Sequence, residues 1–502
     1  MPNKSWEVGF HLRSPRNWLN DPNGLCQFRG RYYFFYQYDH DWPTVDQKAW
    51  GLFTSPDLVH WEYQGVPLQP SIPEDRHGVF SGSAYIEQGA GRFGEDVLQL
   101  YYTGNVVDPV PGHSPKDFDY VYAGREQNTI TCKARVTGPQ GNLQMGRKLV
   151  LMRNDDYPED MSCHVRDPKV WEQDGKRRML LGARHKDTRG LCLLYDSPLD
   201  DGCEWTFRHT IESEYPFGFV WECPNIVRLD GREYLAISPQ GLPRLRDRWF
   251  NRWTPGYFEL PEGQRLLDTH VIDERSFVQW DFGHDFYAPQ TFVDDAGRTI
   301  LVGWMGTFDD HYTSVPDGLD WWHCMTVPRV VTRRSDGRLL QSPAPELEGL
   351  RGAGMSLQTG EPLAVEGRFT EVLIENVDGE GTLTFDDSFQ VFYQDGRLGI
   401  RYLDGASAAG RQDRSIPLDA LGDLRVLVDG SAVEVFANGG AEVFASRWFC
   451  PQKEHLAVAS SFAGTGIVWP LEDVMSEEYR VATELGEAPD LDLPGWNETI
   501  PH

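Results

Sequence analysis

The sequence predicts an all-β protein in which a β-propeller is followed by a C-terminal β-sandwich. Three observations support this fold class. Short runs of apolar and aromatic residues, bounded by Gly, Pro, Asp or Asn, recur along the 502 residues. No long amphipathic helix with a period of about 3.6 residues interrupts them. A loose repeat in the first two thirds of the chain has the length of a propeller blade, about fifty to seventy residues.

The predicted strands of the N-terminal part are short. They are Arg31 to Tyr38, Val97 to Thr103, Arg178 to Ala183, Leu191 to Tyr195, Tyr234 to Ser238 and Thr299 to Met305. A segment from Ser55 to Trp61, which begins Ser-Pro-Asp, recurs loosely from Ser197 to Trp205. With four short strands in each repeat, residues 1–340 would form a propeller of about five blades.

The pattern changes near Ser342 to Pro345. We expect a linker over residues 341–355 with one or two helical turns, since proline is common at the start of a helix and Gly352 can end it. Residues 356–480 predict a β-sandwich, and the alternation is clearest in Ala432 to Phe436 (AVEVF). Residues 481–502 form an acidic tail that we expect to be extended or disordered.

Charge and composition exclude several classes of function. The chain has 47 Lys and Arg against 76 Asp and Glu, a net charge of −29. Such a field repels a nucleic-acid backbone or an anionic membrane. No run of about eighteen apolar residues predicts a membrane span, and the N-terminus lacks the apolar core of a signal peptide. The eight cysteines are scattered without the spacing of metal ligands. We therefore expect a cytoplasmic protein with reduced thiols and no metal.

Four segments combine turn formers with acids or hydroxyls, although each alone could be an ordinary turn, strand rim or ion pair. They are Trp18 to Gly24 (WLNDPNG), Phe80 to Ser83 (FSGS), Arg166 to Lys169 (RDPK) and Trp221 to Pro224 (WECP). The first predicts a tight turn that fixes Asp21. Asp21, Asp167 and Glu222 are together the carboxylates that a glycosidase needs as nucleophile or base and as general acid. A propeller would bring them together from separate blades.

In this order the motifs resemble those of glycoside hydrolase family 32, which includes invertases, fructanases and sucrose-6-phosphate hydrolases. Later segments are similar as well: Asp285 to Gln290 (DFYAPQ), Gly303 to Met305 (GWM), Met325 to Arg329 (MTVPR) and Asp429 to Phe436 (DGSAVEVF). The resemblance covers nearly the whole chain. It implies a five-bladed β-propeller followed by a β-sandwich. It also implies a retaining β-fructofuranosidase that releases terminal fructose through a covalent fructosyl-enzyme, without a cofactor.

The resemblance implies a role for each matching residue. Asp21 resembles the nucleophile, Glu222 the acid/base, and Asp167 the residue that stabilises the transition state. The residues expected to bind the sugar are Asn20, Gln37, Trp50, Phe80, Ser81, Arg166, Tyr287 and Trp304. Of these, Tyr287 and Trp304 would stack on the sugar or wall it, unless they are plain packing residues. Leu52 stands where many members have His, and residues 106–119 are expected to be a loop at the rim of the site.

Several alternatives stay open at this stage. The substrate can be sucrose, a short fructo-oligosaccharide or sucrose 6-phosphate, and a sugar hydroxyl in place of water would make the enzyme a fructosyltransferase. A phosphorylated substrate would require basic residues at the mouth, for which Lys116, Arg125 and Arg184 to Lys186 are candidates. An inverting glycosidase and a non-catalytic sugar-binding propeller are weaker alternatives, because the motif set and all three carboxylates are present. A homo-oligomer formed through the sandwich is also left open.

Overall fold

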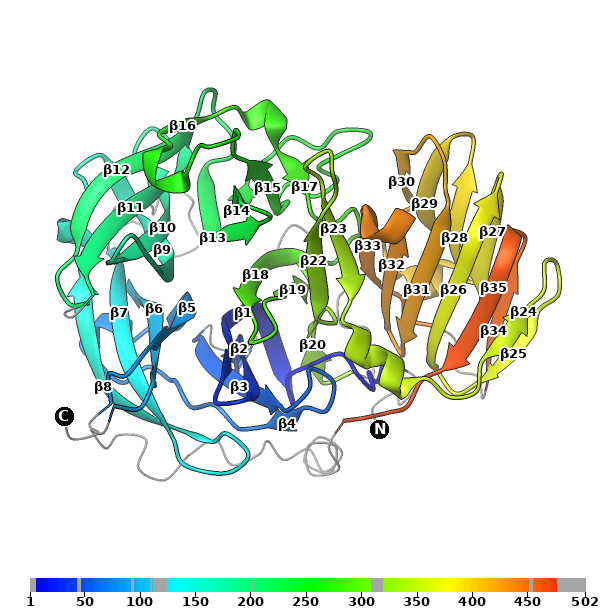
Figure 1. The fold of residues 1–502 in the computed structure, drawn as a ribbon, viewed down its shortest axis with the longest axis horizontal. Helices are drawn as coiled ribbons and strands as arrows, with labels where there is room; N and C mark the ends of the chain where they lie inside the picture. The colour runs from blue at the N-terminus through cyan, green and yellow to red at the C-terminus, as the bar shows by residue number, and fades with distance from the viewer. Residues whose placement is uncertain are drawn as a thin grey trace.

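Five sheets surround a common centre in the N-terminal part of this computed structural model, and a two-layered body lies beside them (Figure 1). The structure describes residues 6–42, 47–91, 94–108, 111, 124–199, 202–307, 319–450 and 455–475. The predicted five-bladed propeller and the C-terminal sandwich are therefore confirmed. In the part of the chain that is described, no helix is long and apolar enough to cross a membrane.

Each blade is one sheet of mostly consecutive strands. The first blade contains β1 (Asn17–Phe28), β2 (Arg31–Asp39), β3 (Ala49–Ser55), β4 (Glu62–Tyr63) and β20 (Trp321–Trp322). The second contains β5 (Val79–Glu87), β6 (Val97–Val107), β7 (Arg125–Val136) and β8 (Leu143–Met152). The third contains β9 (Met161–Gln173), β10 (Lys176–His185), β11 (Gly190–Pro198), β12 (Thr206–Ser213) and β16 (Val271–Ile272).

The last two blades follow the same plan. The fourth contains β13 (Val220–Leu229), β14 (Arg232–Gln240), β15 (Gly256–Glu259) and β17 (Val278–Gln279). The fifth contains β18 (Tyr287–Val293), β19 (Thr299–Met305), β22 (Arg329–Arg333) and β23 (Leu339–Pro343), with β21 (Cys324–Met325) on β19. The strands β1, β5, β9, β13 and β18 contact one another in a closed ring, so they are the innermost strands of the five blades.

The aromatic strand β2 shows why the blades lack a clear apolar–polar alternation. Phe34 and Tyr36 pack into one buried cluster, whereas Tyr33 and Phe35, on the opposite face, pack into another. Side chains of a strand point alternately to its two faces, and neighbouring blades cover both faces here. The sequence repeat also has a structural counterpart, because Ser55 ends β3 and Pro198 ends β11, the third strands of their blades.

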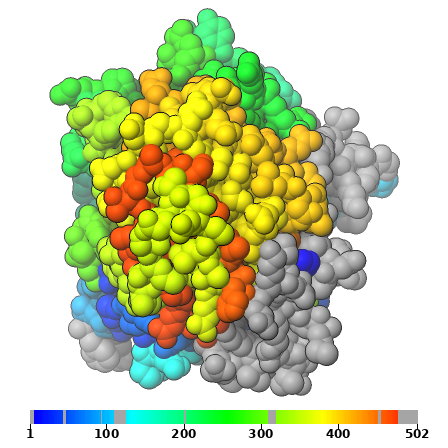
Figure 2. All heavy atoms as spheres, turned by 90° about the vertical axis from the view of Figure 1, so that its right-hand side faces the viewer, coloured from blue at the N-terminus to red at the C-terminus, as the bar shows by residue number. Residues whose placement is uncertain are grey.

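The sandwich consists of two six-stranded sheets. In order, one sheet is β24 (Met355–Leu357), β35 (Ala463–Pro470), β26 (Phe369–Asp378), β31 (Asp423–Asp429), β32 (Ala432–Ala437) and β33 (Glu442–Arg447). The other is β25 (Leu363–Glu366), β34 (His455–Ser460), β27 (Gly381–Phe385), β28 (Phe389–Gln394), β29 (Arg397–Tyr402) and β30 (Arg414–Pro417). Figure 2 looks onto this end of the molecule, where yellow to orange-red atoms of the sandwich cover most of the face.

Helical segments are short. The region expected to be a linker contains the 3-10 helix η6 (Pro345–Leu350), between β23 and β24, as the proline signal predicted. The other helices are η2 (Pro73–Asp75), η3 (Asn154–Asp156), η4 (Leu266–Asp268), η5 (Glu274–Ser276), α1 (Gly405–Ala408) and η7 (Asn438–Gly440). The predicted acidic tail, 481–502, lies outside the described residues.

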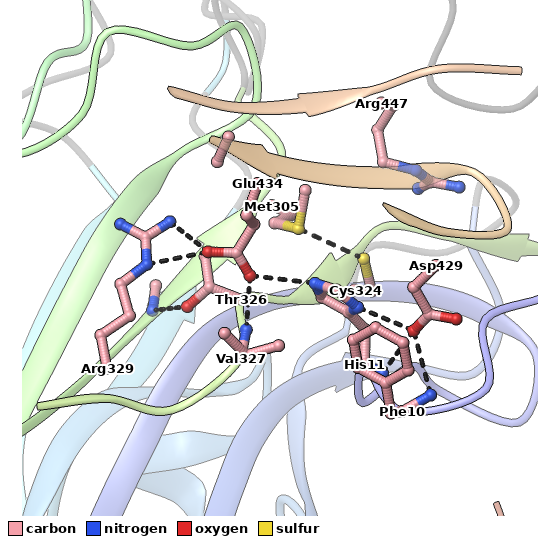
Figure 3. A network of polar contacts seen from close by, with 12 residues as sticks. Phe10, His11, Met305, Cys324, Thr326, Val327, Arg329, Asp429, Glu434 and Arg447 are labelled. Atoms are coloured by element: carbon pink, nitrogen blue, oxygen red, sulfur yellow. Dashed lines mark hydrogen bonds and ion pairs between the residues drawn. The ribbon is translucent and has the colours of Figure 1, made fainter. Parts of the chain in front are cut away.

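A buried polar network joins the propeller to the sandwich (Figure 3). The guanidinium of Arg329 contacts Glu434 at 2.5 Å and Asp281 at 3.1 Å. The ring of His11 lies between two sandwich carboxylates, with Nδ1 2.7 Å from Asp429 and Nε2 2.9 Å from Glu434. The backbone of the propeller segment 282–285 also pairs with the edge strand β33. Covering the edge in this way removes a row of unpaired backbone groups.

Candidate active site

The predicted catalytic motifs lie in β-bulges of the innermost strands. Register shifts interrupt the pairing of β1 after Leu19, of β5 after Phe80, of β9 after Arg166, of β13 after Glu222 and of β18 after Tyr287. All five innermost strands are therefore bulged next to a predicted site residue. A bulge bends the strand and re-aims a side chain, so the bulges of the innermost strands turn polar side chains toward one another.

The prediction of a tight turn at Asp21 is wrong, because the residues from Asp21 to Gly24 belong to β1. Four of the five bulges contain a proline, namely Pro22, Pro168, Pro224 and Pro289. Proline has no N–H for the ladder, so inside a sheet it is tolerated at a bulge or an edge. The residues before the last three prolines, Asp167, Cys223 and Ala288, have positive φ. The prolines that indicated turns in the sequence therefore lie in β-bulges.

The fifth bulge, in β5, depends on a glycine. A Cβ atom at Gly82 would lie 1.9 Å from the carbonyl oxygen of Tyr101 in the neighbouring strand, so only glycine fits. The backbone N–H of Gly82 donates to the Asn23 side chain at 3.0 Å, which links the second blade to the first. The segment FSGS is therefore part of a strand, and its glycine allows a close approach of two backbones.

Asp21 is held by hydrogen bonds from three side chains. The Ser81 hydroxyl donates to Oδ2 at 2.5 Å, and Asn20 Nδ2 donates to Oδ1 at 3.1 Å. The Cys223 thiol lies 3.4 Å from Oδ2. Gln37 connects the first two, since its amide accepts from Asn20 at 3.0 Å and donates to Ser81 at 3.0 Å. Four predicted site residues are thus brought together as one hydrogen-bonded group.

Asp167 lies on the other side of Cys223. The backbone N–H of Cys223 donates to Asp167 Oδ2 at 2.8 Å, while its thiol contacts Asp21. The backbone N–H of Asp167 donates to the Thr103 hydroxyl at 2.9 Å, which holds the bulge of β9 against the second blade. One residue of the fourth blade, Cys223, therefore bridges carboxylates of the first and the third.

Glu222 receives hydrogen bonds at both carboxylate oxygens. The Arg166 guanidinium donates to Oε1, from NH2 at 2.5 Å and from Nε at 3.1 Å. At Oε2, Gln240 Nε2 donates at 2.5 Å and the Tyr287 hydroxyl lies at 2.7 Å. Asp21 and Glu222 each keep part of their surface exposed. These two carboxylates are thus positioned by the protein and still accessible from outside.

The carboxylates of the site lie close enough together to change one another's pKa values. Burial raises the pKa of Asp21, and the charge of Glu222 adds to it, while the hydrogen bond from Ser81 opposes them. Burial also raises the pKa of Asp167, opposed by Arg166 and reinforced by Glu222 and Asp21. The thiol pKa of Cys223 is raised well above its usual value by burial and then by the three carboxylates, so the thiol is protonated. Each negative charge in this site makes the next one less favourable.

The predicted sugar-binding aromatics are placed differently from one another. Phe80 is partly exposed. Trp50 and Trp304 are 0% exposed and Tyr287 is 1% exposed, so none of these three presents an open ring face. Trp50 Nε1 donates to the Phe80 carbonyl oxygen at 3.1 Å, which supports the bulge of β5. Tyr287 contacts Glu222 through its hydroxyl. These rings therefore pack behind the polar residues.

The basic residues suggested for a phosphate are only partly described. Lys116 and most of the stretch 106–119 lie outside the described residues. Arg184 lies 5.3 Å over the ring of Phe219. Burial and then the charges of Arg166, Arg125 and Arg184 lower the pKa of His164 well below its usual value. A neutral His164 can accept a hydrogen bond, and its Nδ1 lies 2.6 Å from Arg166 NH1. Within the described ranges, no group of three or more His, Cys, Asp and Glu could hold a metal ion.

Known protein families match both parts of the chain. Residues 11–343 match the family described as "Glycosyl hydrolases family 32 N-terminal domain", and residues 391–474 match "Glycosyl hydrolases family 32 C terminal". The chain belongs to glycosyl hydrolase family 32. It is 33% identical over 479 residues to "Sucrose-6-phosphate hydrolase" of Bacillus subtilis (strain 168), covering 90% of this chain and 91% of that protein.

Other members of family 32 support the same assignment. "Raffinose invertase" of Escherichia coli is 33% identical over 494 residues, which cover 93% of this chain and 95% of that protein. The solved structure of sucrose-6-phosphate hydrolase from Lactobacillus gasseri superimposes with a TM-score of 0.80 at 26% identity, over 94% of each chain. This family 32 chain is therefore a glycoside hydrolase, as its sequence predicted.

Sequence reasoning missed several residues that contact the candidate carboxylates or their backbone. Gln240 contacts Glu222, Cys223 contacts both aspartates, and Thr103 fixes the backbone of Asp167. Cys223 was found only as a neighbour of Glu222, and Thr103 gave no signal because it lies in an ordinary strand pattern. Gln240 follows Ser238 and Pro239, and that proline near a strand end was the one signal that could have drawn attention to it.

Proposed function

We propose that this enzyme releases terminal fructose from β-D-fructofuranosides by double displacement, with water as the final acceptor. The observation that carries the proposal is the meeting of Asp21, Asp167 and Glu222, from three blades, around Cys223 and Arg166. A retaining glycosidase needs one carboxylate as nucleophile and one as acid/base. Membership in family 32 and relatives named as sucrose-6-phosphate hydrolases and an invertase support fructosides as the substrate class.

In the first step, a carboxylate oxygen of Asp21 forms a bond to the anomeric carbon of the fructosyl unit. The bond from that carbon to the leaving oxygen breaks, and Glu222 transfers its proton to this oxygen. Ser81 and Asn20 fix the Asp21 carboxylate in one orientation, and holding a nucleophile in place in this way removes part of the entropic barrier.

In the second step, Glu222 accepts a proton from water as the water oxygen attacks the same carbon. The bond to Asp21 breaks, fructose leaves, and Glu222 is protonated again. Asp167 stabilises the positive charge that grows on the ring in both steps, by virtue of its charge and position. Arg166 holds Glu222 in the free enzyme and can fork hydrogen bonds to sugar hydroxyls once substrate enters.

The stereochemistry of the product tests the proposal. Early-time NMR of a sucrose digest should show β-fructofuranose first, and an initial α-anomer would overturn direct attack by Asp21. The Glu222→Ala variant should lose nearly all sucrose turnover but keep activity on a fructoside with a good leaving group, because departure then needs no proton. Glu172→Ala, at an exposed acidic residue of β9, is the matched control and should behave as the parent enzyme.

The leaving group is the finer part of the proposal. We place sucrose and short fructo-oligosaccharides first, because the chain carries a net charge of −29 and the field disfavours an anionic sugar. Values of kcat/KM for sucrose, sucrose 6-phosphate, 1-kestose and inulin, measured on one preparation, give the order of substrate preference. A preference for sucrose 6-phosphate over sucrose by more than about tenfold would contradict this order.

We also propose a cytoplasmic location. The eight cysteines all lie in the described part of the chain and form no disulfide there, and seven of them are buried. Reduced cysteines are the rule in the cytosol, where disulfides are rare. Thiol titration of protein purified from its native cells under denaturing conditions should find eight free thiols, and a disulfide in that material would contradict the proposal.

A further inference from the structure

The hydroxyl of Tyr287 has one proton and two acceptors within reach. Glu222 Oε2 lies 2.7 Å from this hydroxyl, and the carbonyl oxygen of Ser238 lies at 2.9 Å. The residue is 1% exposed, so water does not compete for the proton. A phenol can donate one hydrogen bond and accept others. The hydrogen bond that it donates can therefore go to either partner, and the choice depends on the state of Glu222.

We propose that Tyr287 positions Glu222 in both of its protonation states by switching its own hydrogen bond between Glu222 and the Ser238 carbonyl. When Glu222 is ionised, the phenol donates to Oε2. When Glu222 is protonated, the phenol donates to Ser238, and its lone pair faces the acid and can accept from it. This inference rests on the proposed acid/base role of Glu222, which must alternate between these two states in each turnover.

The proton count balances without any further group. In the first step Glu222 gives its proton to the leaving oxygen, and the Tyr287 hydroxyl rotates from Ser238 to the new carboxylate. In the second step Glu222 takes a proton from water, and the hydroxyl rotates back. The phenol keeps its own proton throughout. Burial, followed by the charge of Glu222, raises the pKa of Tyr287 well above its usual value, which agrees with a phenol that stays protonated.

The other groups around Glu222 can serve only one of the two states fully. Gln240 Nε2 and the Arg166 guanidinium are donors without a lone pair to offer. In this arrangement the two groups match the carboxylate and do not accept a hydrogen bond from the acid. The charged or titratable groups that interact electrostatically with Glu222 come from four strands. They are Arg166 and Asp167 from β9, Asp21 from β1, Tyr287 from β18, and Cys223, which follows Glu222 in β13. Among these described groups, Tyr287 alone contacts Glu222 directly with a hydroxyl that can either donate a hydrogen bond to it or accept one from it.

The Tyr287→Phe variant removes the hydroxyl and keeps the ring. Hydrogen bonds to a charged acceptor are about twice as strong as neutral ones, so the ionised form of Glu222 loses more than the protonated form. The alkaline limb of the kcat/KM profile should move up by about half to one pH unit, and kcat on sucrose should fall by about ten- to hundredfold with KM changed less. Gln240→Met removes a donor to the same oxygen and should move the limb in the same direction.

Tyr393→Phe is the matched control. Its hydroxyl lies 3.2 Å from the carbonyl oxygen of Leu418 and 2.9 Å from that of Asp419 in the sandwich, so this variant should lose stability and keep the pH profile of the parent. If Tyr287→Phe loses activity evenly at every pH and its alkaline limb does not move, Tyr287 acts only as a packing residue. That result would overturn the inference.

A double variant separates this inference from the proposed function. In the Glu222→Ala background there is no acid to position, so adding Tyr287→Phe should cause no further loss on a substrate with a good leaving group. A further loss of tenfold or more in that background would show that Tyr287 acts on something other than Glu222. Near-parental sucrose turnover of Glu222→Ala alone would instead overturn the proposed role of Glu222 itself.

Discussion

Two buried groups of acidic side chains lie in this molecule, and they are neutralised to different degrees. At the junction of propeller and sandwich, Asp429 and Glu434 are bonded to His11, and Glu434 also to Arg329. In the centre of the propeller, the guanidinium of Arg166 contacts Glu222 directly and lies 4.0 Å from Asp167. Asp21 receives its hydrogen bonds from neutral groups.

The pKa values follow this difference. Burial raises the pKa of Glu434, but Arg329 and His11 outweigh it and hold the pKa below its ordinary value. At Asp21 and Asp167 burial prevails, and the pKa of each is raised. Asp281 is intermediate, since burial raises its pKa to about 6 although it contacts Arg329. Removing one partner from a fully paired buried group leaves an uncompensated charge, whereas crowded charges can change protonation state during a reaction.

The largest expected effect comes from Asp21→Asn, which removes the proposed nucleophile. Activity on sucrose should fall by at least about 10⁴-fold. The melting temperature should be unchanged or higher, because a carboxylate with a raised pKa in the fold costs stability at neutral pH, and the amide removes that cost. Steady-state rates and thermal unfolding check both parts. Asp295→Asn, at an exposed residue, is the control, and a strongly destabilised Asp21→Asn would contradict the comparison.

Arg329→Met should have the opposite profile. It leaves Asp281 and Glu434 buried without their guanidinium, which should cost about 3–5 kcal/mol of unfolding free energy. The kcat of the protein that stays folded should be close to that of the parent, because Arg329 contacts none of the three site carboxylates in the described structure. Denaturant unfolding and active-site-normalised rates measure this. Arg334→Met, partly exposed beside Asp336, should change neither quantity. A folded but inactive Arg329→Met would mean that the junction also controls the active site, which would contradict the comparison.

The junction should also respond to pH through His11, whose pKa is about 9 in the folded protein. Although burial lowers it, hydrogen bonds to Asp429 and Glu434 raise it above the unfolded value of about 6.5. The stabilisation, about 3 kcal/mol, is fully present below pH 6.5 and is lost as the pH rises through 9. His11→Gln should therefore be less stable than the parent at pH 6 and close to it at pH 10.

Unfolding free energies at those two pH values measure this difference. His455→Gln, at an exposed histidine, serves as the control and should track the parent. A gap between parent and His11→Gln that stays constant from pH 6 to pH 10 would mean that His11 is neutral in the fold.

The smallest expected effect comes from Ser81→Ala in the active site. The hydrogen bond from Ser81 lowers the pKa of Asp21, so its loss raises that pKa, and the ionised nucleophile forms only at higher pH. The acidic limb of kcat/KM should move up, and activity at the optimum should fall by about ten- to hundredfold. Ser83→Ala removes a hydroxyl of the same strand that contacts Pro168 instead, and it should leave the acidic limb in place. If the acidic limb of Ser81→Ala stays at the pH of the parent, Ser81 does not control the pKa of Asp21, and the prediction is contradicted.

Much of the fold could be predicted, because the local signals are strong. The run Thr299–Met305 forms a strand with the expected bounds, and the alternating segment Ala432 to Phe436 lies in β32. The bulges could not be predicted, since a proline after an acid is typical of both a turn and a bulge. Whether Asp21-Pro22 ends a strand or interrupts it depends on β2, which continues to pair on both sides of it.

The same limit applies to the aromatic and polar residues around the carboxylates. From the sequence alone, a tyrosine such as Tyr287 can stack on a sugar or pack in the core. The structure shows a third arrangement, in which its hydroxyl contacts Glu222. Gln240 and Thr103 carry no local pattern, because their partners lie on other blades. Contacts between residues far apart in the chain have no signature in either segment alone.

The sequence by itself determined the all-β class and the order of propeller and sandwich, because apolar periodicity and turn residues are local properties, and its motifs drew attention to Asp21, Asp167 and Glu222. The tertiary structure decided which charges are paired. His11 and Arg329 face carboxylates of the sandwich, and Arg166 faces Glu222 of the next blade. The protonation of a carboxylate depends on burial and on neighbours within a few ångströms, and in a propeller those neighbours come from different blades.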